Sequence, residues 1–486
     1  MSRDDDVYGN FIGGSWVESS TVKLFEDRNP ADNTDLIGRF QESGEDDVDR
    51  AIEAASQSLE DWSSTPGPER GKILRRTAQL MEERKDELAE TLTREEGKTL
   101  SESNGEVQRA VDIFYYYAEK ARDIGGELSS ASGQQKELYT KKKPIGVVGL
   151  ITPWNYPIAI PAWKMAPALA AGNTVILKPA TLAPNVCRKM VACLEEAGIP
   201  EGVVNFVTGA GDVVGKAIAG HDGVDAVSFT GSLEVGEHVY QQASETGKRV
   251  QTEMGGKNPV VVMDSADIEE ATQIAADGAF GVTGQACTAT SRAIVHKDIY
   301  DDFVDAIKDK AEALKIGPGF SDADMGPKVS KDELENTMDY IRVGKEEGAV
   351  LLTGGRRLRD GEYSDGYYLQ PTVFKDVEPD MRIAQEEIFG PVLAVIKAEG
   401  YEEAVHIAND VDYGLSASIV TEDLSEAHRF IEDSEAGVVK VNEKTTGLEL
   451  HLPFGGFKGS SSETWREQGE AGFDFYTITK TVYLNY

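Results

Sequence analysis

The sequence predicts an α/β protein whose core is an open parallel sheet with helices on both faces. From about Ile145 onward, short apolar runs rich in β-branched residues alternate with segments of helical periodicity, as in repeated βαβ units. A second series of the same kind begins near Pro259 and continues to about residue 440. The chain has 486 residues, of which 40% are hydrophobic, so it is long enough for two or three domains.

The first series contains four expected strands and the helices that connect them. The strands are IGVVGLI (145–151), TVILKP (174–179), VVNFV (203–207) and VDAVSFT (224–230). Helices are expected over 157–171 and 184–197, with a short one before the fourth strand and another from Ser232. Because parallel strands end at one edge of a sheet, we expect a ligand at their carboxyl ends.

The second series and the two flanking regions complete the plan. Its expected elements are PVVVM (259–263), a helix over about 268–282, SRAIVH (291–296), TVF (372–374) and VLAVI (392–396). Roughly the first 120 residues read as helix-rich, with a helix over about 46–62, and residues 123–144 are polar and charged. Residues 475–486 alternate β-branched and aromatic side chains, which indicates a late strand that pairs with another segment or another subunit.

Composition restricts the partners and the compartment. Acidic residues number 85 against 49 basic ones, a formal net charge of −36, and the excess runs along the whole chain. Such a surface repels nucleic acid and anionic membranes, and we interpret it as a halophilic composition rather than a merely acidic one. The start MSRDDDVYG has no apolar leader, and the most apolar stretch is too short and interrupted to span a bilayer. We therefore expect a cytoplasmic protein.

Three cysteines and six histidines are present. Cys187 and Cys193 fall in an expected amphipathic helix, where core packing is the expected role. An odd and sparse set gives no disulfide framework, and no histidine is spaced as a metal ligand, so we expect no metal. Cys287 lies instead in GVTGQACTATSR, among glycines and alanines that let a substrate carbonyl approach a thiol. At this point a buried structural cysteine remains the alternative.

Other segments carry groups suited to chemistry. Glu253 in QTEMGGKNP is a candidate general base, with a solvated surface charge or a cap as alternatives. Asn155 ends the first expected strand, where an amide can donate to an oxyanion, and Lys178 ends the second, where a cation can meet ribose hydroxyls or a phosphate. The turns GAGDVVG and FTGS follow the next two strands, and each suits a dinucleotide phosphate or is only a tight connection.

Together these segments resemble the aldehyde dehydrogenase superfamily, over nearly the whole chain. The matching segments, in the family's order, are PWNYP, LKPAT, FTGS, EMGGKNP, GQACTATSR, QEEIFGPV and PFGG. The resemblance implies an aldehyde dehydrogenase-like fold, with a Rossmann-type cofactor domain, an α/β catalytic domain and a small β oligomerisation element that builds dimers or tetramers. We assign these parts, in the same order, to residues 1–122 and 145–255, to residues 256–470, and to residues 123–144 and 471–486.

The resemblance also implies NAD(P)-dependent oxidation of an aldehyde to a carboxylic acid. Cys287 would attack the aldehyde, and the Asn155 amide and the Cys287 N–H would hold the oxyanion of the thiohemiacetal. After hydride transfer, Glu253 would activate water to hydrolyse the thioester, which favours a free acid over transfer to coenzyme A. The alternative from another class is a catalytically silent structural homologue, which would be expected to lack one of these three residues.

Cofactor and substrate residues follow from the same resemblance. They are Thr152, Trp154 and Lys178 on the adenosine side, Gly211, Gly215, Gly231 and Ser232 on the pyrophosphate side, Met254, Glu387 and Phe389 around the nicotinamide, and Tyr156, Trp163 and Phe454 in the substrate tunnel. Many NAD-preferring relatives have Glu where this chain has Thr181. Because Thr can donate to a 2′-phosphate that Glu would repel, we expect NADP to be used at least as well as NAD.

The finer pattern points to one substrate. The segments GLITPWNYPIAIPAWK, MGPKVSKDELENTMDYIRVGKEEGA and LHLPFGGFKGS resemble dehydrogenases of 2-oxoglutarate semialdehyde (2,5-dioxopentanoate) in pentose and sugar-acid breakdown. Succinate semialdehyde, glyceraldehyde and a broad range of aldehydes are the alternatives. An anionic substrate needs a local cation, and Arg292, although close in sequence to Cys287, is expected to be structural.

Overall fold

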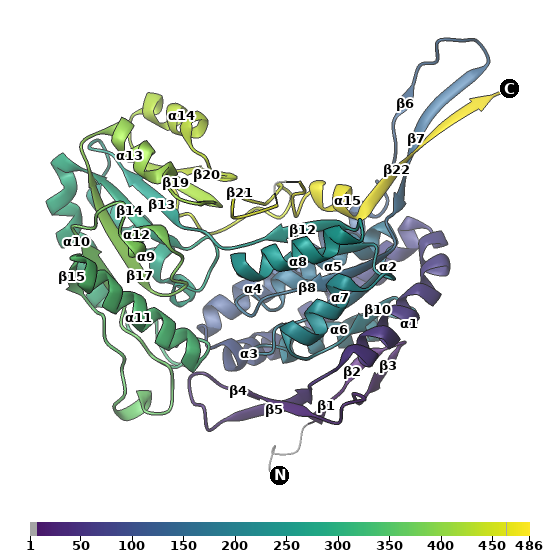
Figure 1. Ribbon diagram of the computed structural model, residues 1–486, viewed down its shortest axis with the longest axis horizontal. Helices are drawn as coiled ribbons and strands as arrows, with labels where there is room; N and C mark the ends of the chain where they lie inside the picture. The colour runs from purple at the N-terminus through teal and green to yellow at the C-terminus, as the bar shows by residue number, and fades with distance from the viewer. Residues whose placement is uncertain (1–6, 463) are drawn as a thin grey trace.

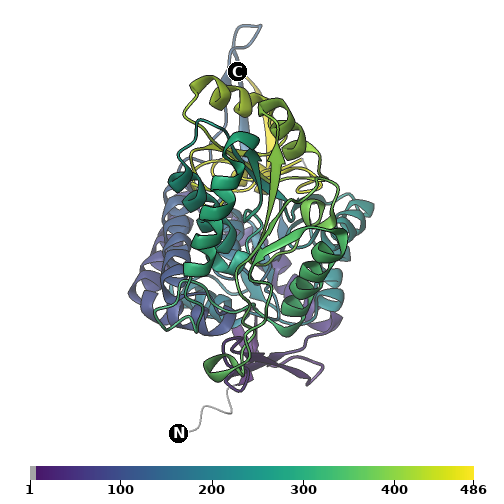
Figure 2. The ribbon, with the colours of Figure 1, turned by 90° about the vertical axis from the view of Figure 1, so that its left-hand side faces the viewer.

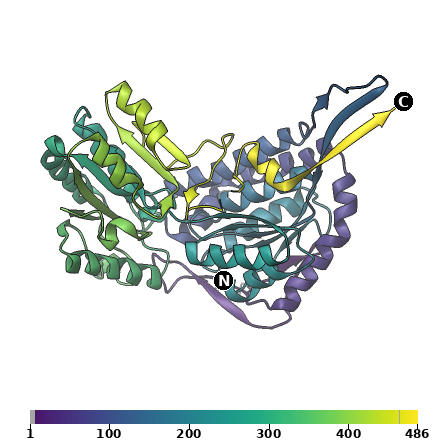
Figure 3. The same cartoon turned by 45° about the horizontal axis from the view of Figure 1, so that its top comes forward.

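The computed structural model describes residues 7–462 and 464–486, and Figure 1 shows two α/β units side by side with a narrow arm projecting from one of them. Residues 1–6, the start of the expected first domain and of the segment without a leader, lie outside the described residues, as does residue 463. Figure 2 shows the N-terminal strands and the arm at opposite ends of the molecule. In Figure 3 the yellow C-terminal segment passes from the second unit back to the first.

A seven-stranded sheet forms the centre of the first unit. Its spatial order is β12-β11-β8-β9-β10-β2-β3. The strands are β2 (Asn10–Ile12), β3 (Ser15–Val17), β8 (Val147–Ile151), β9 (Thr174–Lys178), β10 (Val204–Phe206), β11 (Ala226–Thr230) and β12 (Arg249–Glu253). Strands β8 to β12 run parallel. The chain winds outward from β8 through β9 and β10, and then on the other side through β11 and β12, so the order reverses between β8 and β11. Ligands of such sheets bind at that reversal.

Helices cover both faces of this sheet because successive strand side chains point to opposite sides. Val148 and Leu150 of β8 pack in one core with helices α2 to α6, whereas Val147 and Ile151 pack in another with α1, α7 and α8. The helices are α1 (Glu45–Ser64), α2 (Gly67–Glu83), α3 (Lys85–Glu96), α4 (Leu100–Lys120), α5 (Ala159–Ala171), α6 (Asn185–Glu196), α7 (Lys216–Gly220) and α8 (Leu233–Glu245). A single wide turn over Gly211–Gly215 precedes α7.

The second unit repeats this plan with a second seven-stranded sheet, in the order β15-β16-β17-β14-β13-β19-β20. Its strands are β13 (Asn258–Val262), β14 (Thr290–His296), β15 (Val350–Thr353), β16 (Thr372–Lys375), β17 (Val392–Ala398), β19 (Ser416–Val420) and β20 (Val438–Val441). Its helices are α9 (Ile268–Phe280), α10 (Tyr300–Ala313), α11 (Lys331–Glu347), α12 (Arg382–Gln385), α13 (Tyr401–Asn409) and α14 (Leu424–Asp433), with short turns over Gly281–Gly284, Lys297–Ile299 and Gly361–Tyr363.

Three small sheets complete the fold. One joins β1 (Val7–Tyr8), β5 (Leu36–Gln41) and β4 (Leu24–Arg28), and another pairs β18 (Tyr413–Gly414) with β21 (Phe457–Lys458). The arm consists of β6 (Leu128–Ser129), β7 (Lys136–Pro144) and β22 (Thr477–Asn485), which follows α15 (Ala471–Tyr476). The late strand expected over 475–486 therefore pairs within the chain, antiparallel to β7 along its whole length.

The expected α/β class, with a Rossmann-type unit, is confirmed, but the sheets are not wholly parallel. In the first sheet β2 pairs antiparallel with β10 and β3, and in the second β15 pairs antiparallel with β16. The hairpin β2–β3 turns on Gly13 and Gly14, whose φ values of 60° and 83° need glycine. The expectation that the first 120 residues are mainly helical was incomplete, because from Val7 onward five strands precede α1. None of the described helices is long and apolar enough to cross a membrane.

Candidate active site

A cavity of about 270 Å³ lies where the strand order of the first sheet reverses, and both units contribute to it. It is lined by Pro153, Trp154 and Asn155 after β8, by Thr230, Gly231 and Ser232 at the end of β11, by Met254 and Gly255 after β12, and by Ile160, Cys287, Glu333, Asn336, Glu387 and Phe389. The cavity thus collects the predicted nucleophile, the predicted oxyanion donor and most of the residues expected around a nicotinamide and pyrophosphate.

The loop after β8 presents Asn155 to the cavity. Its side chain is buried, and Nδ2 donates a hydrogen bond to the carbonyl oxygen of Gln285 at 3.0 Å. The carbonyl oxygen of Asn155 accepts a hydrogen bond from Lys98 Nζ at 2.7 Å. A side-chain amide has two N–H groups, so one remains for an oxygen atom bound beside Cys287. Asn155 is therefore held by the loop that carries Cys287, as an oxyanion donor must be.

Cys287 lies between a strained turn and β14, and it is half-buried. Val282, Thr283 and Gly284 have φ values of 51°, 56° and 64°. This left-handed backbone is unfavourable for β-branched residues, so other contacts must hold the turn. On the other side of Cys287, its carbonyl oxygen accepts a hydrogen bond from Asn258 Nδ2 at 2.8 Å. The nucleophile loop is thus fixed on both sides of the thiol.

Two glycines let the segment after β12 pass close to the backbone of Cys287 and to Glu387. A Cβ on Gly256 would lie 2.8 Å from the carbonyl oxygen of Cys287, and a Cβ on Gly255 would lie 1.9 Å from Glu387 Oε2. The Gly256 N–H donates to Glu387 Oε1 at 3.0 Å. The backbone contact at Gly256 excludes a side chain, whereas a side chain at Gly255 would displace the Glu387 carboxylate.

The surroundings of Cys287 keep its thiol protonated before a ligand binds. Burial raises the pKa of Cys287 to about 12, and the carboxyl groups of Glu387 and Glu253 add to the increase. At neutral pH the thiolate is therefore scarce, and the sulfur becomes a nucleophile when a base or a nearby positive charge favours loss of the proton.

Glu253 is the last residue of β12 and is 1% exposed, which excludes the solvated surface charge considered from the sequence. Ser461 Oγ donates to its Oε1 at 3.0 Å, and the Gly456 N–H donates to Oε2 at 3.3 Å. Burial raises its pKa well above the usual range, and the neighbouring Glu467 carboxylate raises it further. A carboxyl group with a raised pKa is a stronger base once it has lost its proton.

The predicted tunnel aromatic residues divide between two places. Trp163 Nε1 donates to Glu467 Oε2 at 2.7 Å, and the ring centroids of Trp163 and Phe454 lie 6.1 Å apart. Phe454 also pairs through its main chain with Glu467, whose carboxylate forms a buried ion pair with Lys164. The ring of Tyr156 instead lies under Lys98 Nζ, 4.5 Å from it. None of the three aromatic residues is among those that line the cavity.

Glu387 and Phe389 follow α12 and line the second side of the cavity. Burial raises the pKa of Glu387 to about 7. The Phe389 ring meets the Trp154 ring edge-on, with centroids 5.4 Å apart, so residues of the two units are in contact here.

The residues expected on the adenosine side lie at neighbouring strand ends. The Thr152 N–H donates to the carbonyl oxygen of Lys178 at 3.1 Å, and a Cβ on Gly215 would lie 3.8 Å from the Lys178 side chain. Burial lowers the pKa of Lys178 to about 8. Thr181 follows β9 in a half-buried turn, and Gly211 opens the turn before α7.

Two orphaned hydroxyls fit a polar ligand along these strand ends. Within residues 7–462 and 464–486, the buried hydroxyls of Thr152 and Thr230 have no hydrogen-bond partner. Buried polar groups are normally satisfied, so a ligand with hydroxyl or phosphate groups at this edge would complete them. The donors present therefore fit a dinucleotide.

Several site residues were missed from the sequence. Asn258 Nδ2 donates to the carbonyl oxygens of Cys287 and Ala289, and its Oδ1 accepts the Ser416 N–H. These partners lie far from Asn258 in the sequence, so a local sequence pattern does not reveal them. Glu333 and Asn336 line the cavity from α11, and their spacing of one helical turn was a usable signal.

Arg292 occupies a structural position. Arg292 is buried, and its guanidinium donates to the carbonyl oxygens of Lys257, Ile407 and Ala408 at 3.0, 2.8 and 2.8 Å. Its donors are directed to the backbone, as expected from the sequence. Among the described residues, Asp264, His296 and Asp298 form a group with metal-ligand atoms within 4.8 Å of one another, outside the residues that line the cavity. The expectation of no metal stays a prediction.

Comparisons with known proteins agree over nearly the whole chain. The model of the "Aldehyde dehydrogenase family" matches residues 16–482. The alpha-ketoglutarate semialdehyde dehydrogenase of Haloferax volcanii is 59% identical over 481 residues, covering 99% of this chain and 100% of that relative. The alpha-ketoglutaric semialdehyde dehydrogenase of Bacillus subtilis is 49% identical over 482 residues, covering 99% of each chain.

A solved structure has the same fold. The betaine aldehyde dehydrogenase of Staphylococcus aureus in complex with NAD⁺ superposes with a TM-score of 0.95 at 36% sequence identity. The match covers 98% of this chain and 94% of that chain.

Proposed function

We propose that this chain, which belongs to the aldehyde dehydrogenase family and is an oxidoreductase, has one physiological substrate. That substrate is 2-oxoglutarate semialdehyde (2,5-dioxopentanoate), which the enzyme oxidises to 2-oxoglutarate. The names of the two full-length relatives support this substrate. The observation that carries the chemistry is the convergence of Cys287, Asn155 and the Glu253 segment at one cavity.

In the first half of the proposed reaction, the Cys287 sulfur attacks the aldehyde carbon to give a thiohemiacetal. Asn155 Nδ2 and the Cys287 N–H donate to the oxygen that becomes negative. The hydrogen bond from Asn155 to Gln285 aims the amide before substrate arrives, so little reorganisation is needed in the transition state.

A bound nicotinamide cofactor would supply the acceptor for the hydride that leaves the thiohemiacetal carbon, so that Cys287 is left with a thioester. Thr152, Trp154, Lys178 and Thr181 would hold its adenosine side. Its diphosphate would be held by Gly211, Gly215, Gly231 and Ser232, and its nicotinamide end by Met254, Glu387 and Phe389. The orphaned hydroxyls of Thr152 and Thr230 support this assignment.

In the second half, Glu253 takes a proton from water, and the water oxygen attacks the thioester to release the acid. The Ser461 hydroxyl and the Gly456 N–H each donate a hydrogen bond to a different oxygen of the Glu253 carboxylate and so orient it. Because burial raises the pKa of Glu253, a rise in pH increases the fraction that can accept a proton, and hydrolysis is expected to accelerate with it.

A panel of aldehydes tests the proposed substrate. We expect kcat/KM for 2-oxoglutarate semialdehyde to exceed that for succinate semialdehyde, glyceraldehyde and betaine aldehyde by about tenfold or more. Formation of reduced cofactor is followed by absorbance, and 2-oxoglutarate is identified as the product. A higher value for another aldehyde would transfer the assignment to that substrate.

We expect NADP to be used at least as well as NAD. Thr181 offers a hydroxyl and no negative charge, and Lys178 supplies a positive one. Because burial lowers the Lys178 pKa to about 8, its charge is present below that pH and is lost above it. The KM for NADP is therefore expected to rise more than the KM for NAD between about pH 7 and about pH 9.

Substitution of Thr181 sharpens this comparison. Thr181→Glu is expected to lower kcat/KM with NADP at least about tenfold, because a carboxylate repels a 2′-phosphate, and to change the value with NAD little. Asp212, whose charge raises the pKa of Lys178, supplies a second variant, because Asp212→Asn should lower that pKa and move the rise in the KM for NADP to lower pH. A large NAD preference in the unmodified enzyme would refute the proposal.

We further propose that residues 123–144 and 471–486 form an oligomerisation element, beside a cofactor domain (1–122 and 145–255) and a catalytic domain (256–470). The arm exposes apolar side chains, with Leu128 79% and Tyr483 69% exposed. We expect the double variant Leu128→Asp and Tyr483→Asp to lower the mass measured by light scattering towards that of a monomer. The control Val22→Asp alters a side chain that is 82% exposed elsewhere, and should leave the mass unchanged. An unchanged mass in the arm variant would contradict the proposal.

The acidic surface leads to a prediction about salt. With a net charge of −36, repulsion between surface carboxylates opposes folding at low ionic strength. We expect the melting temperature and the activity to rise as KCl increases from about 0.1 M to about 2 M. Equal stability in dilute buffer would rule out a halophilic adaptation.

A further inference from the structure

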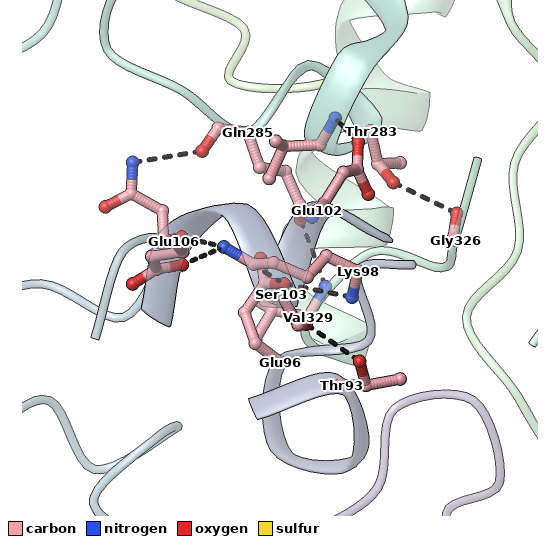
Figure 4. Close-up of polar contacts among 12 residues, drawn as sticks. Thr93, Glu96, Lys98, Glu102, Ser103, Glu106, Thr283, Gln285, Gly326 and Val329 are labelled. Carbon is pink, nitrogen blue, oxygen red and sulfur yellow. Dashed lines mark hydrogen bonds and ion pairs between the residues drawn. The ribbon is translucent and has the colours of Figure 1, made fainter. Parts of the chain in front are cut away.

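The start of α4 lies between the segments that carry the proposed oxyanion donor and the proposed nucleophile (Figure 4). Glu102 and Glu106 are four residues apart on this helix and therefore share one face, and Lys98 precedes the helix. These three side chains are here called the α4 frame. They come from a charged stretch that would ordinarily be expected to face solvent.

Lys98 is 2% exposed, and all its contacts lie inside the protein. Its Nζ donates to Glu106 Oε2 at 2.6 Å and to the carbonyl oxygen of Asn155 at 2.7 Å, and it lies 4.5 Å from the Tyr156 ring centre. Burial alone would lower the pKa of Lys98, but Glu106 and Glu96 hold it above its usual value, so the side chain stays charged. The ammonium group thus fixes the backbone from which the Asn155 amide projects.

Glu106 binds the segment that follows Asn155. Its Oε1 accepts the N–H groups of Ile158 and Ala159 at 3.1 and 3.2 Å, at the first turn of α5. Those N–H groups are the free donors of a helix N-terminus, which attracts a carboxylate. Glu106 therefore sets where α5 begins, and together Lys98 and Glu106 hold the backbone at Asn155 and at the start of α5.

Glu102 holds the other segment. Its Oε2 caps α4 by accepting the N–H and the hydroxyl of Thr99, both at 2.9 Å, while its Oε1 accepts the Val282 N–H at 2.6 Å. Val282 begins the left-handed turn that leads to Cys287. A capping carboxylate that also binds a strained turn couples the position of α4 to that of the nucleophile loop.

We propose that the α4 frame sets the spacing between the Asn155 amide and the Cys287 sulfur, and that Lys98, Glu102 and Glu106 are positioning residues for the acylation step. The inference rests on the proposed roles of Asn155 and Cys287. The frame contacts the backbone of Asn155, the N-terminus of α5 and the turn before Cys287, rather than the reacting atoms. Its loss should therefore slow the step that needs an oxyanion donor, without changing the intrinsic reactivity of the thiol.

The test compares two reactions of Cys287. The pre-steady-state burst of reduced cofactor with propanal requires the oxyanion donor, whereas alkylation by iodoacetamide requires only the sulfur. Propanal is used so that the outcome does not depend on the proposed physiological substrate. The variant is Lys98→Met combined with Glu106→Gln, which removes both charges of the closest ion pair together. Glu96 also loses Lys98 as a partner, and because burial already raises its pKa to about 8, it is expected to remain protonated at neutral pH. Glu102→Ala tests the contact with the nucleophile loop, and Glu102→Gln is a variant that retains an acceptor oxygen.

The expected result is a burst rate constant lowered about tenfold or more in the double variant and in Glu102→Ala, with the alkylation rate of the double variant within about twofold of the parent. Glu102→Gln should recover most of the burst. When the double variant is built on Asn155→Ala, it should add less than about threefold, because both changes then affect the same interaction.

A matched control separates positioning from general stability. Glu95 is another buried carboxylate, and it accepts the N–H groups of Asn185 and Val186 at the start of α6. Glu95→Gln should lower the melting temperature as much as the frame variants do and leave the burst within about twofold. The proposed positioning role of the α4 frame would be overturned by any of three results. These are a fall in the alkylation rate equal to the fall in the burst rate, effects that are fully additive with Asn155→Ala, and a burst loss of the same size in Glu95→Gln. An unchanged burst in Asn155→Ala itself would overturn both the oxyanion assignment and the frame.

Discussion

Replacing Cys287 by Ala is expected to lower the steady rate of aldehyde oxidation by about 10⁴-fold or more. Without the sulfur, no thiohemiacetal forms, and the hydride has no covalent intermediate to leave. The change removes a half-buried side chain at the edge of a cavity, so the melting temperature and the dissociation constant for the cofactor should change little. Steady turnover followed at the absorbance of reduced cofactor measures the effect.

The other two cysteines supply the control. Cys187 and Cys193 lie on the buried face of α6, where they are 0% and 1% exposed, and burial raises the pKa of each thiol. Cys187→Ala should therefore lower stability while leaving kcat within about twofold, the reverse of the effect at Cys287. Retention of even a tenth of the activity in Cys287→Ala would show that another group attacks the aldehyde.

Glu253→Gln is expected to separate the two halves of the reaction. Gln keeps the size of Glu, and its amide oxygen can still accept the Gly456 N–H while its NH2 group donates to the Ser461 hydroxyl oxygen, but it cannot take a proton from water. Steady turnover should fall about 10²- to 10⁴-fold, while the first turnover still produces one equivalent of reduced cofactor per site. Rapid mixing under conditions of excess substrate measures both quantities in one trace.

The direction of the charge change makes this test sharper. The Glu253 carboxylate contributes to the high pKa of Cys287, so a neutral Gln should ease ionisation of the thiol. The burst rate should therefore stay equal or increase. Loss of the burst together with steady turnover would contradict a role confined to hydrolysis and would place Glu253 in the attack itself.

The central strands could be predicted from sequence because each is a continuous apolar run buried on both faces, as in β8 and β9. Strand β12 was missed because Arg249–Glu253 reads as polar. Its side chains are buried by distant partners instead, such as Ser228, which donates to Gln251, and Ser461, which donates to Glu253. A local pattern does not reveal burial that is satisfied by residues far along the chain. The hairpin at Gly13 and Gly14 did have a local signal in its two-glycine turn.

The same distinction applies to the site. The candidate residues Cys287, Glu253 and Asn155 were found because their segments resemble a known family. Lys98 was not singled out, because a lysine in a charged stretch ordinarily faces solvent. Its partners are eight residues away in Glu106 and 57 residues away in Asn155, and only the folded chain brings them together. The left-handed turn at Val282 and Thr283 was likewise unpredictable, since these residues disfavour that backbone.

The most direct test of the proposed mechanism is the mass of the Glu253→Gln enzyme, quenched in acid after one turnover with cofactor and 2-oxoglutarate semialdehyde. We expect one acyl group per chain, confined to the peptide that contains Cys287 and formed at the rate of the burst. An enzyme that completes the burst without an adduct, or that carries the acyl group on another residue, would contradict covalent catalysis by Cys287 followed by hydrolysis through Glu253.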